Sequence, residues 1–269
     1  MGIPTGKRGD FEGEMMEIFG FDLSGILPFV AVGFVAQLID GAIGMAFGVI
    51  TNTLLVSILG VPPAHASARV HVVEMFTTAA SGISHIIHRN VDWGLFRRLA
   101  IPGVIGAVLG AYVLTSIDAS VAKPFVMAYL ACIGIYLLYK AWGYTHVHRE
   151  PKIIAPLGLI GGFLDAAGGG GWGPVVTSNL LIQGTSPRMT VGTVNTAEFF
   201  LTTAASATFI SQLGLEAFSI ATFGLLIGGM VAAPMAAFVA RHVQPQRLML
   251  MVGVVLTATS LFSLYKALA

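Results

Sequence analysis

The fold of this chain depends on residues 165–174, which read Asp165-Ala166-Ala167-Gly168-Gly169-Gly170-Gly171-Trp172-Gly173-Pro174. Four consecutive glycines cannot form a stable helix interior, because each one costs about 1 kcal/mol relative to alanine. At membrane depth, irregular backbone is tolerated only where it is buried in protein or lines a cavity. If the chain lies in a bilayer, this stretch therefore predicts a break between two short helices inside a bundle.

The composition places the chain in a bilayer. Of its 269 residues, 55% are hydrophobic and only 10% are charged, whereas soluble domains carry about 25% charged residues. A soluble core cannot bury that much apolar surface, but helices in lipid can be apolar on all sides. The net charge of +1 gives no basic face for nucleic acid and no acidic tail for a protein partner.

A second break precedes the first, at Asp40-Gly41-Ala42-Ile43-Gly44-Met45-Ala46-Phe47-Gly48. The two breaks align with each other, and the match continues along both halves of the chain. The matched pairs include Asp40 with Asp165, Gly48 with Gly173, Pro63 with Pro187, Glu74 with Glu198, and Tyr139 with Tyr265. Chance rarely aligns two of the few acidic pairs of such a chain, so the sequence predicts an internal duplication.

Each half contains five apolar pieces. A spanning helix needs about 20 mostly apolar residues. Four segments meet this with no interior charge except Lys123 near one end, and two more are long enough but carry ionisable residues. The rest are short pieces that are either tilted crossings or re-entrant half-helices. The clear segments are 99–116, 121–140, 217–240 and 248–265, the charged ones 66–87 and 190–212, and the short pairs 23–39 with 47–60 and 153–164 with 172–183.

An odd number of pieces per half predicts that the halves are inverted relative to each other. Basic residues cluster in the loops at 88–98 and 241–247 and in the central linker, but not in the repeat-equivalent loops. This swap predicts that the three basic segments are cytoplasmic and that both termini lie outside. We expect an all-α polytopic membrane protein with two inverted repeats, each holding one broken or re-entrant helix pair plus three spanning helices. Its parts are an N-terminal interfacial segment at 1–22, a first repeat at 23–142, a linker at 143–152 and a second repeat at 153–269.

Ionisable residues inside the membrane segments mark one candidate site. His71, Glu74, Thr78 and His85 recur at helical spacing on one face, and Asn195, Glu198 and Thr202 follow the same face in the second half. Such residues usually face a bundle interior or an aqueous cavity. The alternative is structural: the glutamates hydrogen-bond between helices or pair with Arg69.

The glycine breaks mark a second candidate site. A helix begins after each break, and the free N–H groups and positive dipole end of a helix N-terminus attract anions. Close helix packing is the alternative explanation, and we assign Gly103, Gly106, Gly110, Gly224 and Gly228 to it. The expected substrate-binding residues are Gly44, Gly48, Asn52, His71, Gly169, Gly170, Gly171, Trp172, Gly173, Asn179 and Asn195. The expected coupling residues, for H⁺ or Na⁺, are Asp40, Glu74, Asp165 and Glu198.

The sequence contains no metal-ligand or nucleotide-binding pattern. Residues 168–173 resemble a phosphate loop, but no Gly-Lys-Ser/Thr follows them. No nucleophile is paired with a base, as a membrane-embedded enzyme or protease would require. We therefore expect no cofactor, no metal and no enzymatic activity.

The duplicated Asp-x-x-x-Gly-x-x-x-Gly breaks, the cluster through Trp172-Gly173-Pro174 and the stretch Asn195-Thr196-x-Glu198 resemble the TauE/SafE family of sulfite and sulfonate exporters and permeases. The resemblance covers roughly residues 25 to 268 and implies a multi-pass carrier of the prokaryotic inner membrane for small sulfur-containing anions. We expect a secondary transporter, because no ATPase motif is present. An anion channel is the alternative within transport, and a homodimer is left open.

Overall fold

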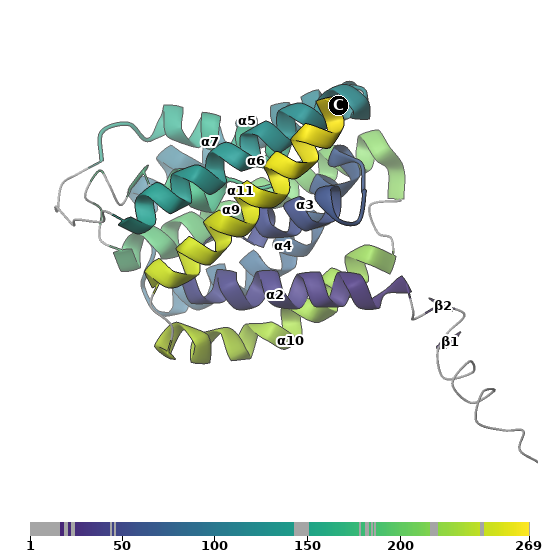
Figure 1. Cartoon of the computed structure of the whole chain (residues 1–269). Coiled ribbons are helices and arrows are strands. Elements are labelled where there is room, and N and C mark those ends of the chain that lie inside the picture. Colours follow the sequence, from purple (N-terminus) through teal and green to yellow (C-terminus); the bar gives the residue numbers. More distant parts are fainter. Residues whose placement is uncertain are drawn as a thin grey trace, which may run out of the picture.

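A computed structural model describes residues 17–18, 21–22, 25–43, 45, 47–142, 151–177, 179–180, 183, 185, 187–215, 220–242 and 245–268. The described part is a helical bundle (Figure 1), which confirms the all-α expectation. The first half contains α2 (Leu27–Ile43), α3 (Phe47–Ser57), α4 (Pro63–Ile87), α5 (Trp93–Ser116) and α6 (Ala119–Trp142). The second half contains α7 (Ala155–Gly168), η2 (Trp172–Thr177), α9 (Pro187–Leu213), α10 (Ile220–His242) and α11 (Pro245–Leu268). In the N-terminal segment, β1 (Glu17–Ile18) pairs antiparallel with β2 (Phe21–Asp22).

Both breaks lie where the sequence places them, between α2 and α3 and between α7 and η2. Gly169 ends α7 in the left-handed conformation, with φ of 71°, and its N–H donates to the Asp165 carbonyl. The segment after this break is a single π-helical stretch, whereas α3 is an ordinary α-helix. Pro174 lies inside the π-helical stretch and has no N–H to donate, which accounts for irregular hydrogen bonding there.

Glycines allow two helix pairs to pack backbone against backbone. Gly162 of α7 lies on the backbone of Gly103 in α5, and Gly110 of α5 lies on the backbone of Phe163 in α7. The contact positions advance together along both helices, so α5 and α7 run parallel. Gly224 and Gly228 of α10 lie in the same way on α2, which also runs parallel to its partner. The sequence-based assignment of these glycines to close packing is confirmed.

Two other helix pairs run antiparallel. Gly82 of α4 lies beside Thr196 of α9, while Asn90, after the end of α4, lies beside Gly192 near the start of α9. Gly134 of α6 packs on Thr257 of α11, and Leu138, further along α6, packs on Gly253, earlier in α11. The direction of one helix is therefore opposite to that of its partner in both pairs.

These directions fix which helix ends share one end of the bundle. The end of α4, the starts of α5 and α7, the end of α6 and the start of α11 lie together, and the C-terminus lies at the opposite end (Figure 1). The loop after α4, the linker after α6 and the turn before α11 thus join helices at the same end. The loop after α9 joins helices at the other.

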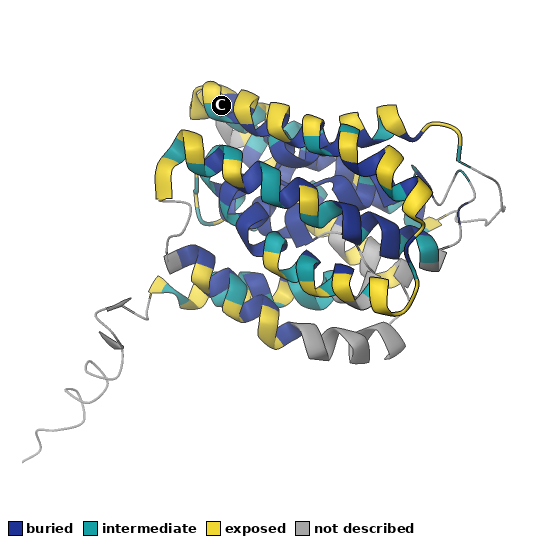
Figure 2. Cartoon of the chain, turned by 180° about the vertical axis from the view of Figure 1, so that it is seen from behind, coloured by how far each residue is buried: buried dark blue, intermediate teal, exposed yellow. Residues whose placement is uncertain are grey.

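The outer surface of the bundle is apolar. Exposed side chains on α5 include Ile101, Ile105 and Leu109, and Figure 2 shows exposed residues outside with buried ones between the helices. Within the described residues, α5 and α6 are long and apolar enough to cross a membrane, and the shorter apolar helices span Leu27–Asp40, Phe47–Ser57, Ala155–Gly168, Ala221–Ala232 and Gly253–Tyr265. The helices α4 and α9 lie inside and carry the ionisable residues, so their sequences are less apolar.

Candidate functional site

A cavity of about 470 Å³ lies between the two halves of the chain, and residues of α2, α4, α7, α9 and both breaks line it. Four carboxylate side chains line it, and each half supplies one from its break and one from its long inner helix. They are Asp40, Glu74, Asp165 and Glu198. The structure thus brings together all four residues that the sequence predicts as coupling residues.

Each break is held by its own aspartate. The N–H of Phe47 donates to Asp40 Oδ1 at 3.0 Å, and the N–H of Trp172 donates to Asp165 Oδ1 at 2.9 Å. Both bonds span seven residues, so the two halves use the same local geometry. The carboxylates take the place of a helix-capping side chain at the start of α3 and η2. The expectation that these helix N-termini offer free N–H groups to an anion is wrong for Phe47 and Trp172, because the chain's own carboxylates already accept from them.

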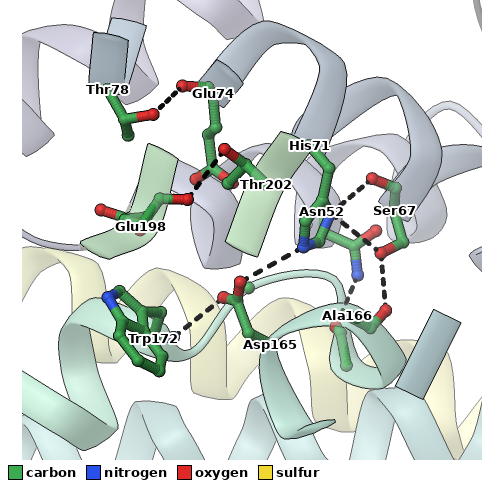
Figure 3. Close-up of polar contacts among 12 residues, drawn as sticks. Asn52, Ser67, His71, Glu74, Thr78, Asp165, Ala166, Trp172, Glu198 and Thr202 are labelled. Atoms are coloured by element: carbon green, nitrogen blue, oxygen red, sulfur yellow. Dashed lines mark hydrogen bonds and ion pairs between the residues drawn. The ribbon is translucent and has the colours of Figure 1, made fainter. Parts of the chain in front are cut away.

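Asp165 also joins the two halves through His71 of α4. Its Oδ2 lies 3.2 Å from His71 Nε2, while Nδ1 of the same ring lies 2.8 Å from the carbonyl oxygen of Ser67 (Figure 3). A carbonyl oxygen only accepts, so Nδ1 carries a hydrogen. The Nε2–Oδ2 contact then needs a hydrogen of its own, which either the ring or the carboxyl group holds. The pair consequently contains one shared proton and is neutral as a whole in either arrangement.

This arrangement corrects the predicted role of His71. The ring is fully buried and faces Asp165, so it neither lines the cavity nor pairs with Glu74. Ser67 adds to the link, because its hydroxyl donates to the carbonyl of Ala166 at 2.7 Å. His71 therefore positions the second break and is not placed to bind an anion directly.

One oxygen of the buried Glu74 carboxylate is left without a partner among the described residues. Glu74 is 5% exposed, and its Oε2 has no hydrogen-bond partner among the described residues. Its other oxygen lies beside Gly48, whose backbone N–H is a donor to the carboxylate. The alternative pairing of Glu74 with Arg69 is wrong, because neither Glu74 Oε2 nor Arg69 Nε has a hydrogen-bond partner among the described residues, and the ion pair of α4 joins His71 to Asp165.

The inner helices contribute neutral polar groups. Asn195 Nδ2 donates to Ser81 Oγ at 3.0 Å, which connects α9 to α4 at the cavity wall. Thr78 donates to the Glu74 carbonyl and Thr202 to the Glu198 carbonyl, so the two glutamates share another local feature (Figure 3). The remaining polar lining residues are Gln37, Thr77 and His85.

The four-glycine run lies directly against the first break. Gly170, with φ of 131°, packs on the backbone of Gly48 and Val49. Asn52 of α3 donates to the carbonyl of Gly168 at 2.9 Å, and Tyr129 of α6 donates to the carbonyl of Gly170 at 3.1 Å. The run is thus buried between α3 and α6, and only its end at Gly171 reaches the cavity.

The predicted substrate-binding residues consequently divide. Gly48, Gly171, Gly173 and Asn195 line the cavity. Six others lie outside the lining. Polar groups of four of them bond to other parts of the protein, and the backbone of the two glycines packs within the breaks. The six are Asn52, His71, Trp172 and Asn179, and the glycines Gly169 and Gly170. Gly44 lies outside the described residues.

Sequence reasoning missed several residues at the site. Ser81 lies seven residues after Glu74 and therefore on the same helix face, a signal that was available. Gln37 lies three residues before Asp40 and carries the same kind of signal on α2. Tyr129 and Ser67 come from positions that no local pattern connects to the breaks. In the described part of the chain, no group of three or more His, Cys, Asp or Glu residues is placed to hold a metal ion.

Comparisons with known proteins identify the family. The family described as sulfite exporter TauE/SafE matches residues 29–263. The chain is also 46% identical over 237 residues to the probable membrane transporter protein YtnM of Bacillus subtilis (strain 168), a match that covers 85% of this chain and 79% of that protein. No solved structure gives a significant match. The matched region includes both breaks, all four carboxylates and every helix that lines the cavity, so this chain belongs to the sulfite exporter TauE/SafE family.

Proposed function

We propose that this chain is a secondary membrane transporter that carries a small sulfur-containing anion, such as sulfite or an organosulfonate, and couples its movement to H⁺ or Na⁺. The observation that supports this most is the cavity of about 470 Å³, lined by four carboxylates and several neutral polar groups, between inner helices of an apolar bundle. Polar groups at membrane depth are expensive and usually mark a substrate or ion path. Membership of the TauE/SafE family supports the substrate class.

The two halves would form inverted repeats, an arrangement found in many alternating-access carriers. The repeat-equivalent helices α4 and α9 run in opposite directions where they touch, and so do α6 and α11. Two halves related by an axis along the membrane normal would make equivalent helices parallel, whereas an axis in the membrane plane makes them antiparallel. The two parallel pairs also fit an axis in the membrane plane. In the repeat, α2 is equivalent to α7 and α10 to α5, so exchanging the halves turns the α2–α10 contact into the α7–α5 contact.

Asn195, Ser81 and Gln37 are the best placed direct donors to the anion. They come from three different elements and line the cavity with neutral hydrogen-bonding groups. The amide backbone of Gly171 and Gly173 lies at the same wall. Rocking of one half against the other around this fixed site would expose it to each side in turn.

Sidedness gives a first testable prediction. We expect the end of the bundle that joins α4 to α5 to be cytoplasmic and the end after α9 to be external, because the basic segments gather at the former. In a Cys132→Ala background, an impermeant thiol reagent added outside intact cells should label Gly214→Cys and leave Asn90→Cys unlabelled until the membrane is opened. Labelling of both positions from one side would exclude inverted halves.

Transport itself is tested in liposomes. The purified protein should catalyse uptake of sulfite or methanesulfonate but not of choline or a neutral amino acid, because the substrate is proposed to be an anion. Counter-flow separates a carrier from an anion channel: an internal excess of unlabelled anion should draw in labelled anion against its own gradient only through a carrier. Transport of choline alone would overturn the proposal.

A further inference from the structure

The cavity is acidic, which is unexpected for a site that takes an anion. Its carboxylates are those of Asp40, Glu74, Asp165 and Glu198, and among its described lining residues there is no Lys or Arg. His85 is the only imidazole of that lining. Two negative charges about 4 Å apart repel by several kcal/mol at the effective dielectric constant of a protein. An anion therefore cannot enter this space while all four carboxylates are charged.

The four carboxylates differ in what offsets their charge. Asp165 accepts from the Trp172 N–H and shares a proton with His71, and Asp40 accepts from the Phe47 N–H. Glu74 is 95% buried, lines the cavity and leaves Oε2 without a partner. Glu198 occupies the equivalent place on α9, and no described donor reaches its carboxylate. The two glutamates are thus the groups for which neutralisation matters most.

Resting on the proposed function, we propose that the anion binds together with protons taken up by Glu74 and Glu198, so that anion and proton cross the membrane in the same direction. Each glutamate that is loaded gains an O–H bond and loses its negative charge. The proton comes from water on the loading side and returns to water on the releasing side. A protonated carboxyl group also becomes a hydrogen-bond donor, which an anion can use.

The groups around Glu74 favour H⁺ over Na⁺ in this role. It faces Asp40 of α2, the Gly48 amide of α3, Asp165 of α7 and Glu198 of α9. On α4 itself the neighbouring ionisable side chains are Arg69, His71 and His85, of which only His85 lines the cavity. A sodium ion needs several oxygen ligands converging on one point, and in the described part of the chain no group of three or more His, Cys, Asp or Glu side chains is placed to hold a metal ion, so neutral oxygens would have to supply most of them. A proton needs only one oxygen.

The decisive measurement is proton uptake on anion binding by the intact purified protein. Methanesulfonate is the probe because it stays ionised throughout the range used, so any proton taken up is bound by the protein. Binding is measured by calorimetry in two buffers of different ionisation heat, at about pH 6 and about pH 8. We expect net proton uptake and an apparent Kd that rises by about tenfold per pH unit for each proton bound. Binding without proton uptake, or binding that depends on Na⁺ and not on pH, would overturn this inference and leave the proposed function standing.

Failure of the proposed function looks different. If neither methanesulfonate nor sulfite binds at either pH, both the proposed function and the present inference are wrong. Sulfite serves only to detect binding, because it titrates near neutral pH and would obscure the count of protons.

Variants locate the protons. Glutamine mimics a protonated glutamate, so Glu74→Gln and Glu198→Gln should each reduce proton uptake and flatten the pH dependence of Kd, with tighter binding than the parent at about pH 8. Asp118→Asn is the matched control, because Asp118 is a fully exposed carboxylate between α5 and α6 that only bonds Ser120. It should leave proton uptake unchanged. Parent-like proton uptake in both glutamine variants would show that these glutamates do not carry the protons.

Discussion

Replacing Asp165 by alanine is expected to stop transport and to lower the free energy of unfolding by about 3 to 5 kcal/mol, the range found when one member of a buried ion pair is removed. Asp165 is 2% exposed and holds two groups at once, the N–H of Trp172 and the ring of His71. Its loss leaves the Trp172 N–H and His71 Nε2 without a partner and removes the side-chain bond between the second break and His71 of α4. Thermal unfolding in detergent, together with liposome uptake, measures the two effects.

Two further variants serve as controls for this prediction. Asp40→Ala removes only the acceptor of one N–H and should lower the free energy of unfolding by about 1 kcal/mol. Asp165→Asn should be tolerated far better than alanine, because the amide oxygen can accept from Trp172 while the amide nitrogen donates to neutral His71 Nε2. Equal losses for Asp165→Ala and Asp40→Ala would contradict the link through His71.

Replacing Gly170 by valine is expected to abolish transport and to destabilise the protein by at least about 3 kcal/mol. A side chain at this position would meet the backbone of Gly48 and Val49, which cannot move aside as a flexible side chain could. Its φ of 131° is also strained for any residue with a Cβ. The two breaks would be forced apart at the wall of the cavity, so the predicted loss of transport includes a loss of stability.

Gly60→Val separates strain from steric conflict. Gly60 also has a positive φ, of 68°, but an added side chain there meets nothing within 4 Å. We expect a cost of about 1 to 2 kcal/mol from backbone strain alone and normal transport in the folded fraction. Size-exclusion profiles after graded heating rank the two variants. If Gly60→Val were as damaging as Gly170→Val, backbone strain and not close packing would explain both.

The side chains of α4 show what helical spacing predicts and what it does not. Spacing along α4 correctly places His71, Glu74 and Thr78 on the inner side of the helix. It does not show what each side chain contacts: His71 bonds to Asp165, 94 residues away. Helical periodicity predicts which face of the helix a side chain lies on. Its closest partner depends on which residue of the neighbouring helix lies at the same level along the helix axis.

The helix N-termini illustrate the same limit for the glycine breaks. Because glycine cannot sustain a helix, the positions of both breaks follow from the sequence alone. The sequence also places an aspartate before each break, and we interpreted these residues as coupling groups only. The structure shows that each aspartate accepts a hydrogen bond from the N–H seven residues later. The chain's own carboxylates therefore bond to the N–H groups at the starts of α3 and η2 that were expected to attract an anion.

The sequence by itself determined the membrane environment, the helices and the two breaks, because these follow from composition, segment length and the intrinsic cost of glycine in a helix. It also selected the four carboxylates, since charges at membrane depth are rare and need a polar surrounding. Only the tertiary structure decided that they share one cavity, that Asp165 is bonded to His71 and that Glu74 Oε2 is left unpartnered. These are contacts between residues far apart in the chain, and they are set by how α4, α7 and α9 approach one another in space.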